Sequence, residues 1–165
     1  MMKKKTGGYT FMGNNLKLIL LILTLLVAFQ TKALSQIPIE VVDYSEDMVG
    51  QMLVYRVKEK FRESNIFYLP LVPKGFRFRV QISTMDRFKG DDSRSNLSTM
   101  YSVIWLLYDD EKFIFPIYLD HTLGYSGRDV VGSTAEEIVA RTDKIITQFG
   151  ELLKMLDKLL KPEGK

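Results

Sequence analysis

Residues 76–85 alternate between apolar and polar side chains, which is the period of a β-strand with one buried face. One face collects Phe76, Phe78, Val80 and Ile82, and the other collects Arg77, Arg79, Gln81 and Ser83. A strand of this kind is typical of an antiparallel sheet that meets water on one side. The chain must therefore supply a second layer that covers the apolar face.

Residues 47–63 repeat apolar side chains at helical intervals and predict an amphipathic helix. Ser45 or Asp47 can cap its first amides, and Asn65 can take the left-handed conformation that closes a helix. The buried stripe would consist of Val49, Met52, Leu53, Val57 and Phe61.

A longer amphipathic helix is predicted from about Thr134 to Leu160, with Ser133 and Glu136 as a capping box and Pro162 as its end. Its apolar residues recur in steps of four and three, as in coiled coils, and a second stripe widens the face enough to cover a sheet. Because this helix outreaches an ordinary strand, we expect its C-terminal end to overhang and to meet a partner. The partner-binding residues there would be Leu152, Leu156 and Leu159.

Further strands are marked by β-branched and aromatic residues between turn signals. The expected strands are Ile66–Val72, Phe76–Met85, Met100–Tyr108, Phe113–Leu119 and a short optional one over Ile37–Val42. Pro38 interrupts the donors of the optional strand, and Pro116 places the last strand at an edge or bulge. The chain should form an α+β two-layer sandwich, with a mainly antiparallel four-stranded sheet and two helices, the C-terminal one long.

The first 35 residues have the organisation of a secretory signal peptide. Lysines at positions 3–5 precede an apolar run over residues 18–29, and Ala33-Leu34-Ser35 offers small residues for cleavage before Gln36. An uncleaved membrane anchor is the alternative, but Lys17 limits the apolar run to about a dozen residues, where a spanning helix needs about 20. We therefore expect cleavage.

Removal of residues 1–35 would leave a single mature domain, residues 36–165, with 18 basic against 20 acidic side chains. This near-neutral charge gives no reason to expect nucleic acid or anionic lipid as a partner. The chain has no cysteine, so it lacks both disulfides and the thiol of a lipid anchor. We expect a periplasmic or secreted protein with no stable membrane span after cleavage.

The segment from Asp120 to Ser133 is expected to be a glycine-bearing loop, and it contains the only histidine. Asp120, His121 and Ser126 are the residue types of an acyl-transfer triad. However, the first two are adjacent, and no nucleophile-elbow motif surrounds the serine. The simpler interpretation is that Asp120 and His121 end a strand and the glycines turn the chain towards the last helix.

Residues 127–134 have the glycine spacing of a phosphate-binding loop and open a helix. Ser133 stands where that motif needs lysine, so nucleotide hydrolysis is not expected. A weak anion site formed by Arg128, Ser133 and Thr134 remains a hypothesis, and a capped, unoccupied helix start is the simpler one.

A second loop, from Asp86 to Ser98, is expected to be solvated because its charges are mixed. Asp91, Ser93 and Ser95 are spaced like alternate calcium ligands, but Asn96 replaces the required glycine. One histidine and no cysteine leave few zinc ligands. We expect neither a metal nor a cofactor.

Two surface hypotheses concern the sheet. Arg77 and Arg79 are expected to face solvent, and pairing with cross-strand carboxylates or with an acidic partner is the alternative. Trp105 is expected to pack in the core together with nearby tyrosines, and an aromatic recognition surface is the alternative. These tyrosines are Tyr101, Tyr108 and Tyr118.

Four segments together resemble small exported bacterial proteins of uncharacterised function. They are Gly50–Tyr55, Ser83–Asp86, Tyr101–Trp105 and Ala135–Ala140. The resemblance covers most of the expected mature region and contains no diagnostic catalytic motif. It implies a location in the bacterial envelope and assigns no site residues.

The expected function is that of an exported, non-enzymatic binding or accessory module of the cell envelope, which engages a protein through its sheet surface or its C-terminal helix. Two alternatives stay open. One is a small periplasmic hydrolase that uses the Asp120 to Ser133 loop, and the other is a structural protein that self-associates through the C-terminal helix.

Overall fold

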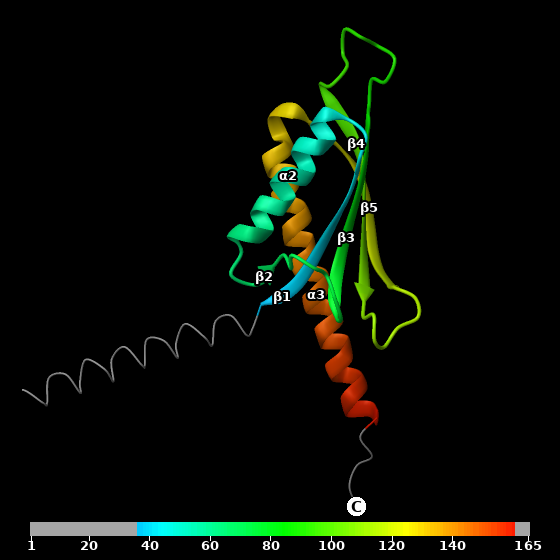
Figure 1. The fold of residues 1–165 in the computed structure, drawn as a ribbon. Helices are drawn as coiled ribbons and strands as arrows, with labels where there is room; N and C mark the ends of the chain where they lie inside the picture. The colour runs from blue at the N-terminus through cyan, green and yellow to red at the C-terminus, as the bar shows by residue number, and fades with distance from the viewer. Residues whose placement is uncertain (1–35, 161–165) are drawn as a thin grey trace, which may run out of the picture. The chain divides into compact units, whose positions relative to one another are not determined.

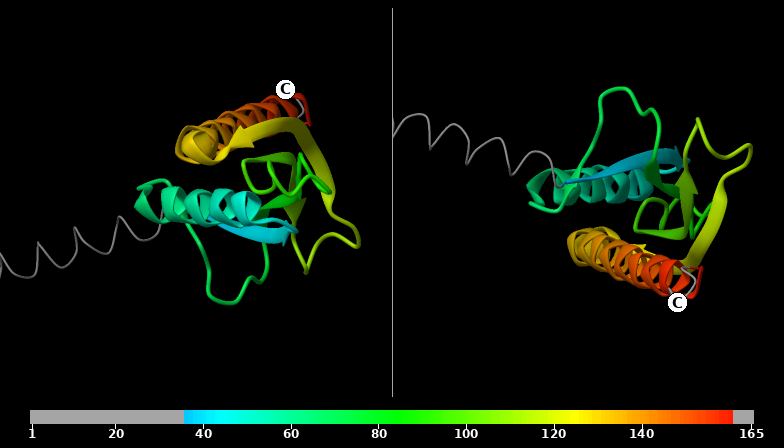
Figure 2. Two further views of the ribbon diagram at one scale, coloured as in Figure 1. Left: turned by 90° about the horizontal axis from the view of Figure 1, so that it is seen from above. Right: turned by 90° about the horizontal axis from the view of Figure 1, so that it is seen from below.

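The computed structural model describes residues 36–160, with side chains through residue 155. The expected signal peptide and Pro162 lie outside the described residues. Figure 1 shows a sheet with two helices on one of its faces, and the end-on views of Figure 2 agree. This arrangement confirms the predicted α+β fold with a long C-terminal helix.

The sheet has five strands in the order β2-β1-β3-β4-β5. In chain order the elements are β1 (Ile37–Ser45), α2 (Met48–Glu63), β2 (Phe67–Tyr68), β3 (Arg77–Asp86), β4 (Ser98–Tyr108), β5 (Ile117–Gly127), the 3-10 helix η1 (Arg128–Val130) and α3 (Val131–Leu160). β4 is antiparallel to both β3 and β5. β1 is parallel to both β2 and β3, so the sheet is mixed.

β1 is an interior strand and not a short optional one. Its pairing with β3 runs from Ile39, opposite Phe78, to Ser45, opposite Thr84. Pro38 is tolerated because it precedes this paired segment and faces only β2. The missing donor of the proline therefore costs the β1–β3 ladder nothing.

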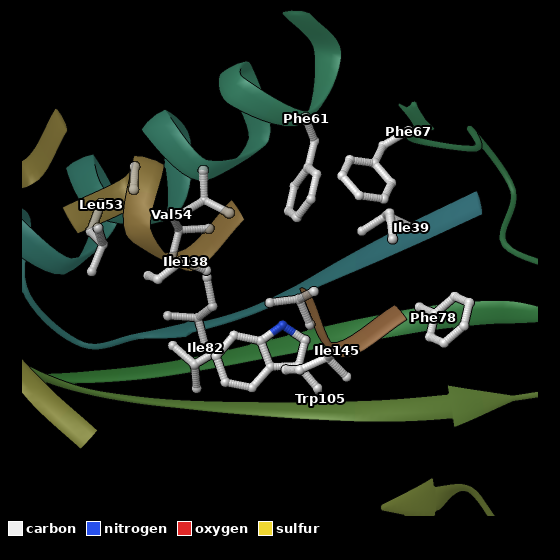
Figure 3. Packing of buried hydrophobic residues seen from close by; sticks show 14 of the residues in the cluster. Ile39, Leu53, Val54, Phe61, Phe67, Phe78, Ile82, Trp105, Ile138 and Ile145 are labelled. Carbon is white, nitrogen blue, oxygen red and sulfur yellow. The ribbon is translucent and has the colours of Figure 1, made fainter. Parts of the chain in front are cut away.

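The hydrophobic core lies between the sheet and the two helices (Figure 3). Trp105 of β4 is the largest fully buried side chain, and its indole N–H donates to the Thr142 hydroxyl of α3 at 2.8 Å. Phe61 of α2 packs edge-on against Phe67, with ring centroids 5.4 Å apart. α3 also contacts α2, so the wide apolar face of α3 is divided between the sheet and the other helix.

Asp47 caps α2, as one of the two predicted candidates, and also joins the helix to the sheet. Its buried carboxylate accepts a hydrogen bond from the Gly50 N–H at 2.8 Å. The same carboxylate accepts from the hydroxyls of Thr84, on β3, at 2.7 Å and Thr99, on β4, at 2.8 Å. One side chain therefore positions α2 on two strands.

The other end of α2 differs from the prediction. Ser64 is the C-cap in an extended conformation, and its N–H donates to the Phe61 carbonyl. The Ser64 hydroxyl oxygen accepts from the N–H of Ile66. Within the described residues the one non-glycine residue with positive φ is Asn96, so Asn65 is not left-handed. The serine closes the helix without that conformation.

Two predicted strands are much shorter than expected. Of Ile66–Val72 only the two residues of β2 pair, because Pro70 and the following Pro73 lack the N–H groups that a ladder needs. Of Phe113–Leu119 only the last part is strand, since β5 begins directly after Pro116. The apolar residues left over belong to loops.

β5 occupies most of the segment predicted to be the Asp120 to Ser133 loop. Its register with β4 shifts by one residue, since Trp105 lies opposite Asp120 whereas Leu106 lies opposite Tyr118. Leu119 is the extra residue of this bulge. The bulge prediction for this strand therefore holds, although the irregularity lies after Pro116 and not at it.

α3 begins at Val131, earlier than the predicted Thr134. Ser133 lies inside the first turn and donates its hydroxyl to the Val130 carbonyl at 2.9 Å. Glu136 forms an ion pair with Lys60 of α2 at 2.9 Å. The predicted capping box is therefore wrong, because η1 leads directly into the helix and both side chains have other partners.

Candidate functional site

The helices cover one face of the sheet, and the opposite face has no helix on it (Figure 2). Because strand side chains alternate, cross-strand neighbours project from this face in rows. We define the helix-free face by three rows, which are Val42, Gln81, Ile104 and His121; Tyr44, Ser83, Ser102 and Leu123; and Met85, Met100 and Tyr125.

Exposed apolar and aromatic side chains lie at both sides of this face. Leu123 and Tyr125 on β5 are 73% and 63% exposed, and Tyr44 on β1 is 54% exposed. Small side chains lie between them, at Ser83 and Ser102, and form a shallow trough. The face therefore offers raised apolar groups on either side of a low polar centre.

Charged residues gather at one end of the sheet and neutralise one another. The Glu40 carboxylate accepts from Nε of Arg77 at 2.7 Å and from Nε of Arg79 at 3.0 Å. Asp110 accepts from Nη1 of Arg77 at 2.8 Å, and this hydrogen bond holds the pKa of Asp110 below its ordinary value. The Arg79 guanidinium also lies 3.7 Å from the centroid of the Tyr108 ring.

This network corrects the expectation for the two arginines. Arg77 is buried and is not a solvent-facing residue, and the alternative of pairing with neighbouring carboxylates is the one that the structure shows. The aromatic residues divide in a similar way. Trp105 is buried in the core. Tyr118 of β5 is exposed and lies opposite Leu106, next to the first row of the helix-free face.

Asp120, His121 and Ser126 all lie on β5, and the structure does not bring them together. Asp120 is paired with Arg141 of α3 at 2.8 Å, whereas His121 contacts the Tyr118 hydroxyl. Ser126 is buried six residues further along, which is about 20 Å in an extended strand. His121 projects from the face opposite to the other two, so no nucleophile and base meet.

Arg141 covers the outer edge of β5 at this point. Its Nη2 donates to the His121 carbonyl at 3.0 Å, and its Nε donates to the Asp120 carboxylate at 3.0 Å. That carboxylate also accepts the His121 N–H at 2.8 Å. These groups therefore satisfy an exposed strand edge, which would otherwise be open to pairing.

The residues of the hypothetical anion site are each held within the chain. Nη2 of Arg128 donates to the Asn96 carbonyl at 2.8 Å. The hydroxyls of Thr134 and Ser126 lie 2.9 Å apart in a buried position. Ser133 donates to a carbonyl of η1. The structure uses all three to fix the start of α3.

Asp91 organises its own loop in a similar manner. Its carboxylate accepts from the Ser93 hydroxyl and the Arg94 guanidinium, both at 2.6 Å, and these bonds lower its pKa. In the part of the chain that the structure describes, no group of three or more His, Asp or Glu residues is arranged to hold a metal ion. No helix within the same part is both long and apolar enough to cross a bilayer.

In the C-terminal part of α3 the structure describes side chains only through residue 155. Leu152 is about half exposed and lines a groove between α3 and β5 together with Ile117 and Phe149. The side chains of Leu156 and Leu159 lie outside the described residues. Leu152 is thus the one predicted partner-binding residue whose surroundings can be stated.

Leu123 and Tyr125 were not predicted as site residues, although the sequence contains a signal for them. His121, Leu123 and Tyr125 alternate with smaller residues, which is a strand pattern. Gly124 obscures it, and its role is steric: a β-carbon there would lie 2.5 Å from the ring of Tyr101 on β4. Comparison with protein-family models and with curated proteins gave no match.

Proposed function

We propose that the chain is an exported, non-enzymatic binding or accessory module of the bacterial cell envelope, and that a protein partner binds to its helix-free face. The observation that carries this proposal is the exposure of Tyr44, Leu123 and Tyr125 around a shallow trough. The floor of the trough is formed by Ser83 and Ser102, and Glu46 is its charged lining residue. Centres of protein interfaces are rich in aromatic residues and Met and poor in charge. Export is supported by the N-terminal pattern and by the resemblance to exported proteins.

The chemistry of the face describes the partner. The rows contain no side chain with a fixed charge, and the nearby Glu40 and Arg79 are already paired. At the edge of the face, Glu46 pairs with Lys89 at 3.8 Å and the Arg87 guanidinium lies 4.9 Å from the centroid of the Tyr125 ring. A partner surface with apolar groups and uncharged hydrogen-bonding groups fits this pattern, and salt should affect its affinity little. Hydrolysis is not proposed, because Asp120, His121 and Ser126 are held apart.

The test places a photo-crosslinking amino acid at Tyr125 in the tagged full-length chain, expressed in its native cells. Tyr55, an exposed tyrosine on α2, is the matched control position. We expect a specific envelope protein to be captured from Tyr125 and not from Tyr55. Substitution of Leu123→Lys should abolish this capture, since it replaces an exposed apolar side chain of the face with a charged one.

Equal capture from both positions, or capture that survives Leu123→Lys, would contradict the proposal. Capture of a second copy of the chain would instead support self-association. Fractionation of the same cells tests export, because a chain that stays entirely in the cytoplasm would contradict the envelope location.

A further inference from the structure

Two loops expose large apolar side chains that no core contact requires. The β2–β3 loop, residues 69–76, carries Leu71 with its side chain wholly exposed. The β4–β5 loop, residues 109–116, carries Ile114 and Phe115, which are 92% and 78% exposed. None of the three belongs to the core cluster or packs on it. We refer to these segments as the apolar loops.

The apolar loops lie at the same end of the sheet, which is the lower end in Figure 1. β3 begins and β4 ends there, since Arg77 lies opposite Tyr108 in the register. Nη1 of Arg77 donates both to the Gly75 carbonyl and to the Asp110 carboxylate, each at 2.8 Å. One buried side chain therefore fixes the two loops relative to each other.

The chain enters the fold at this end as well. The Ile37 N–H donates to the Ile66 carbonyl at 2.7 Å, just before β2. The exposed part of α3 also reaches this end, because Leu152 lines a groove with Ile117 at the start of β5.

The opposite end of the sheet has a different chemistry. The β3–β4 loop there is dominated by charged residues, which include Arg87, Lys89, Asp91, Asp92 and Arg94. Soluble proteins rarely expose grouped apolar side chains without a binding partner for them. The two ends therefore differ in what they expose: the β3–β4 end carries mainly charged loop residues, whereas the other end adds large exposed apolar side chains to the paired charges of Arg77, Glu40 and Asp110.

We propose that the apolar loops insert into the surface of a lipid bilayer and hold the domain there as a peripheral protein. A bilayer fits because these side chains form two clusters at the tips of separate loops, Leu71 with Val72 and Ile114 with Phe115, in contrast to the rows of the helix-free face. Lys74 and Lys112 flank them, and their stems can cover apolar surface while their charged ends stay among the headgroups. The Lys112 ammonium pairs with Asp109 at 3.7 Å, so the acidic start of the β4–β5 loop is partly neutralised. Insertion of this kind reaches about 5–10 Å into the boundary of headgroups and acyl chains.

Apolar burial and not net charge drives this binding. The expectation that a near-neutral chain is not attracted to anionic lipid is therefore compatible with it. Once cleaved before Gln36, the protein should bind vesicles of zwitterionic lipid about as well as vesicles that include anionic lipid, with little effect of salt. The uncleaved chain carries five further lysines, which favour the anionic vesicles. The proposal is independent of the helix-free face, and either can fail alone.

The test uses the cysteine-free full-length chain, in which single substitutions accept an environment-sensitive fluorophore. Ile114→Cys and Leu71→Cys place the label on the apolar loops, and Ser93→Cys places it on the polar end as the matched control. Phosphatidylcholine vesicles are added, and iodide is used as an aqueous quencher. We expect the two apolar-loop labels to shift to shorter wavelength and to become protected from iodide, and the control label to do neither.

A label on the apolar loops that stays open to iodide while the protein sediments with vesicles would overturn the proposal, because residues 18–29 alone would then account for binding. Absence of vesicle binding would overturn it too. Protection that appears without vesicles would assign the apolar loops to contacts between copies of the chain instead.

A second pair of variants tests the energetic contribution. The double substitution Ile114→Ser with Phe115→Ser should lower vesicle partitioning at least about tenfold, since it removes two large apolar side chains from the inserted set. Ser93→Ala, at the polar end, should leave partitioning unchanged. An unchanged partition coefficient in the double variant, with an unchanged circular dichroism spectrum, would contradict the proposal.

Discussion

Gly50 of α2 lies so close to Thr84 of β3 that a β-carbon on Gly50 would stand 1.8 Å from the threonine hydroxyl oxygen. The Asp47 carboxylate would be 2.8 Å from the same β-carbon. The first turn of α2 therefore rests directly on the sheet, at the point where Asp47 links them.

Substitution of Gly50→Ala should accordingly lower the free energy of unfolding by about 1–3 kcal/mol or more. The added carbon would force α2 away from the sheet, where the Asp47 carboxylate binds Thr84 and Thr99. Urea denaturation of the purified chain measures this effect. Gly150→Ala in α3 is the control, since no neighbouring atom lies within 4 Å of the added carbon. It should be neutral or stabilise by up to about 1 kcal/mol.

Asp47→Asn should also destabilise the fold, by about 1–3 kcal/mol, because one amide oxygen cannot accept what two carboxylate oxygens accept from Gly50, Thr84 and Thr99. The same denaturation assay applies. Asp92→Asn, at an exposed loop position, should change the stability by less than about 0.5 kcal/mol. Equal effects of the two substitutions would argue against the role of Asp47.

The Trp105 indole N–H depends on the Thr142 hydroxyl as its acceptor. Thr142→Val should leave this buried donor unpaired and cost about 1–3 kcal/mol, whereas Thr142→Ser keeps an acceptor and should cost less. The chain has one tryptophan, so its fluorescence reports the unfolding transition of both variants directly. A serine variant as unstable as the valine variant would assign the effect to packing.

The stability should fall in acid through two carboxylates, one at the end of β3 and one in the β4–β5 loop. Backbone N–H groups of Asn96 and Phe88 lower the pKa of Asp86, and Arg77 lowers that of Asp110. A carboxyl group whose pKa is lower in the folded state binds protons more readily in the unfolded state. Its contribution to the free energy of unfolding is therefore present above the unfolded pKa of about 3.9 and is lost as the pH falls through the folded pKa.

We therefore expect a nearly constant free energy of unfolding from about pH 7 to pH 5 and a decline below about pH 4. Denaturant titrations across this range measure the decline. Asp86→Asn should make it shallower, because the asparagine side chain does not titrate. An identical acid slope in that variant would show that other groups cause the decline.

Elements with a complete amphipathic period were predictable from the sequence. β3 and α2 lie where their patterns place them, because each buries one face against the core. The part of β5 beyond Leu119 was missed because Gly124 was interpreted as a turn residue, although its function is to leave room for the Tyr101 ring. The interior place of β1 was also missed, since a strand pattern does not specify its neighbours or their direction.

The candidate site was less predictable than the fold, for a related reason. The helix-free face depends on register, which brings Tyr44 of β1 into one row with Leu123 of β5 across two intervening strands. No local segment contains that information. Parts of the apolar loops were misassigned as strands, because the apolar residues around Leu71 and Ile114 have strand propensity. The nearby prolines lack the backbone N–H groups that strand pairing needs.

The interior place of β1 has a consequence for the order of events as the chain folds from its N-terminus. A chain that emerges from its N-terminus presents β1 first, yet its main partner, β3, follows only after a delay on the order of 40 residues. Until β2 and then β3 have formed, both edges of β1 lack their neighbours. β1 is therefore the first strand to be made but stays unpaired until later strands form. Proteases or holding chaperones would meet it before the rest of the fold.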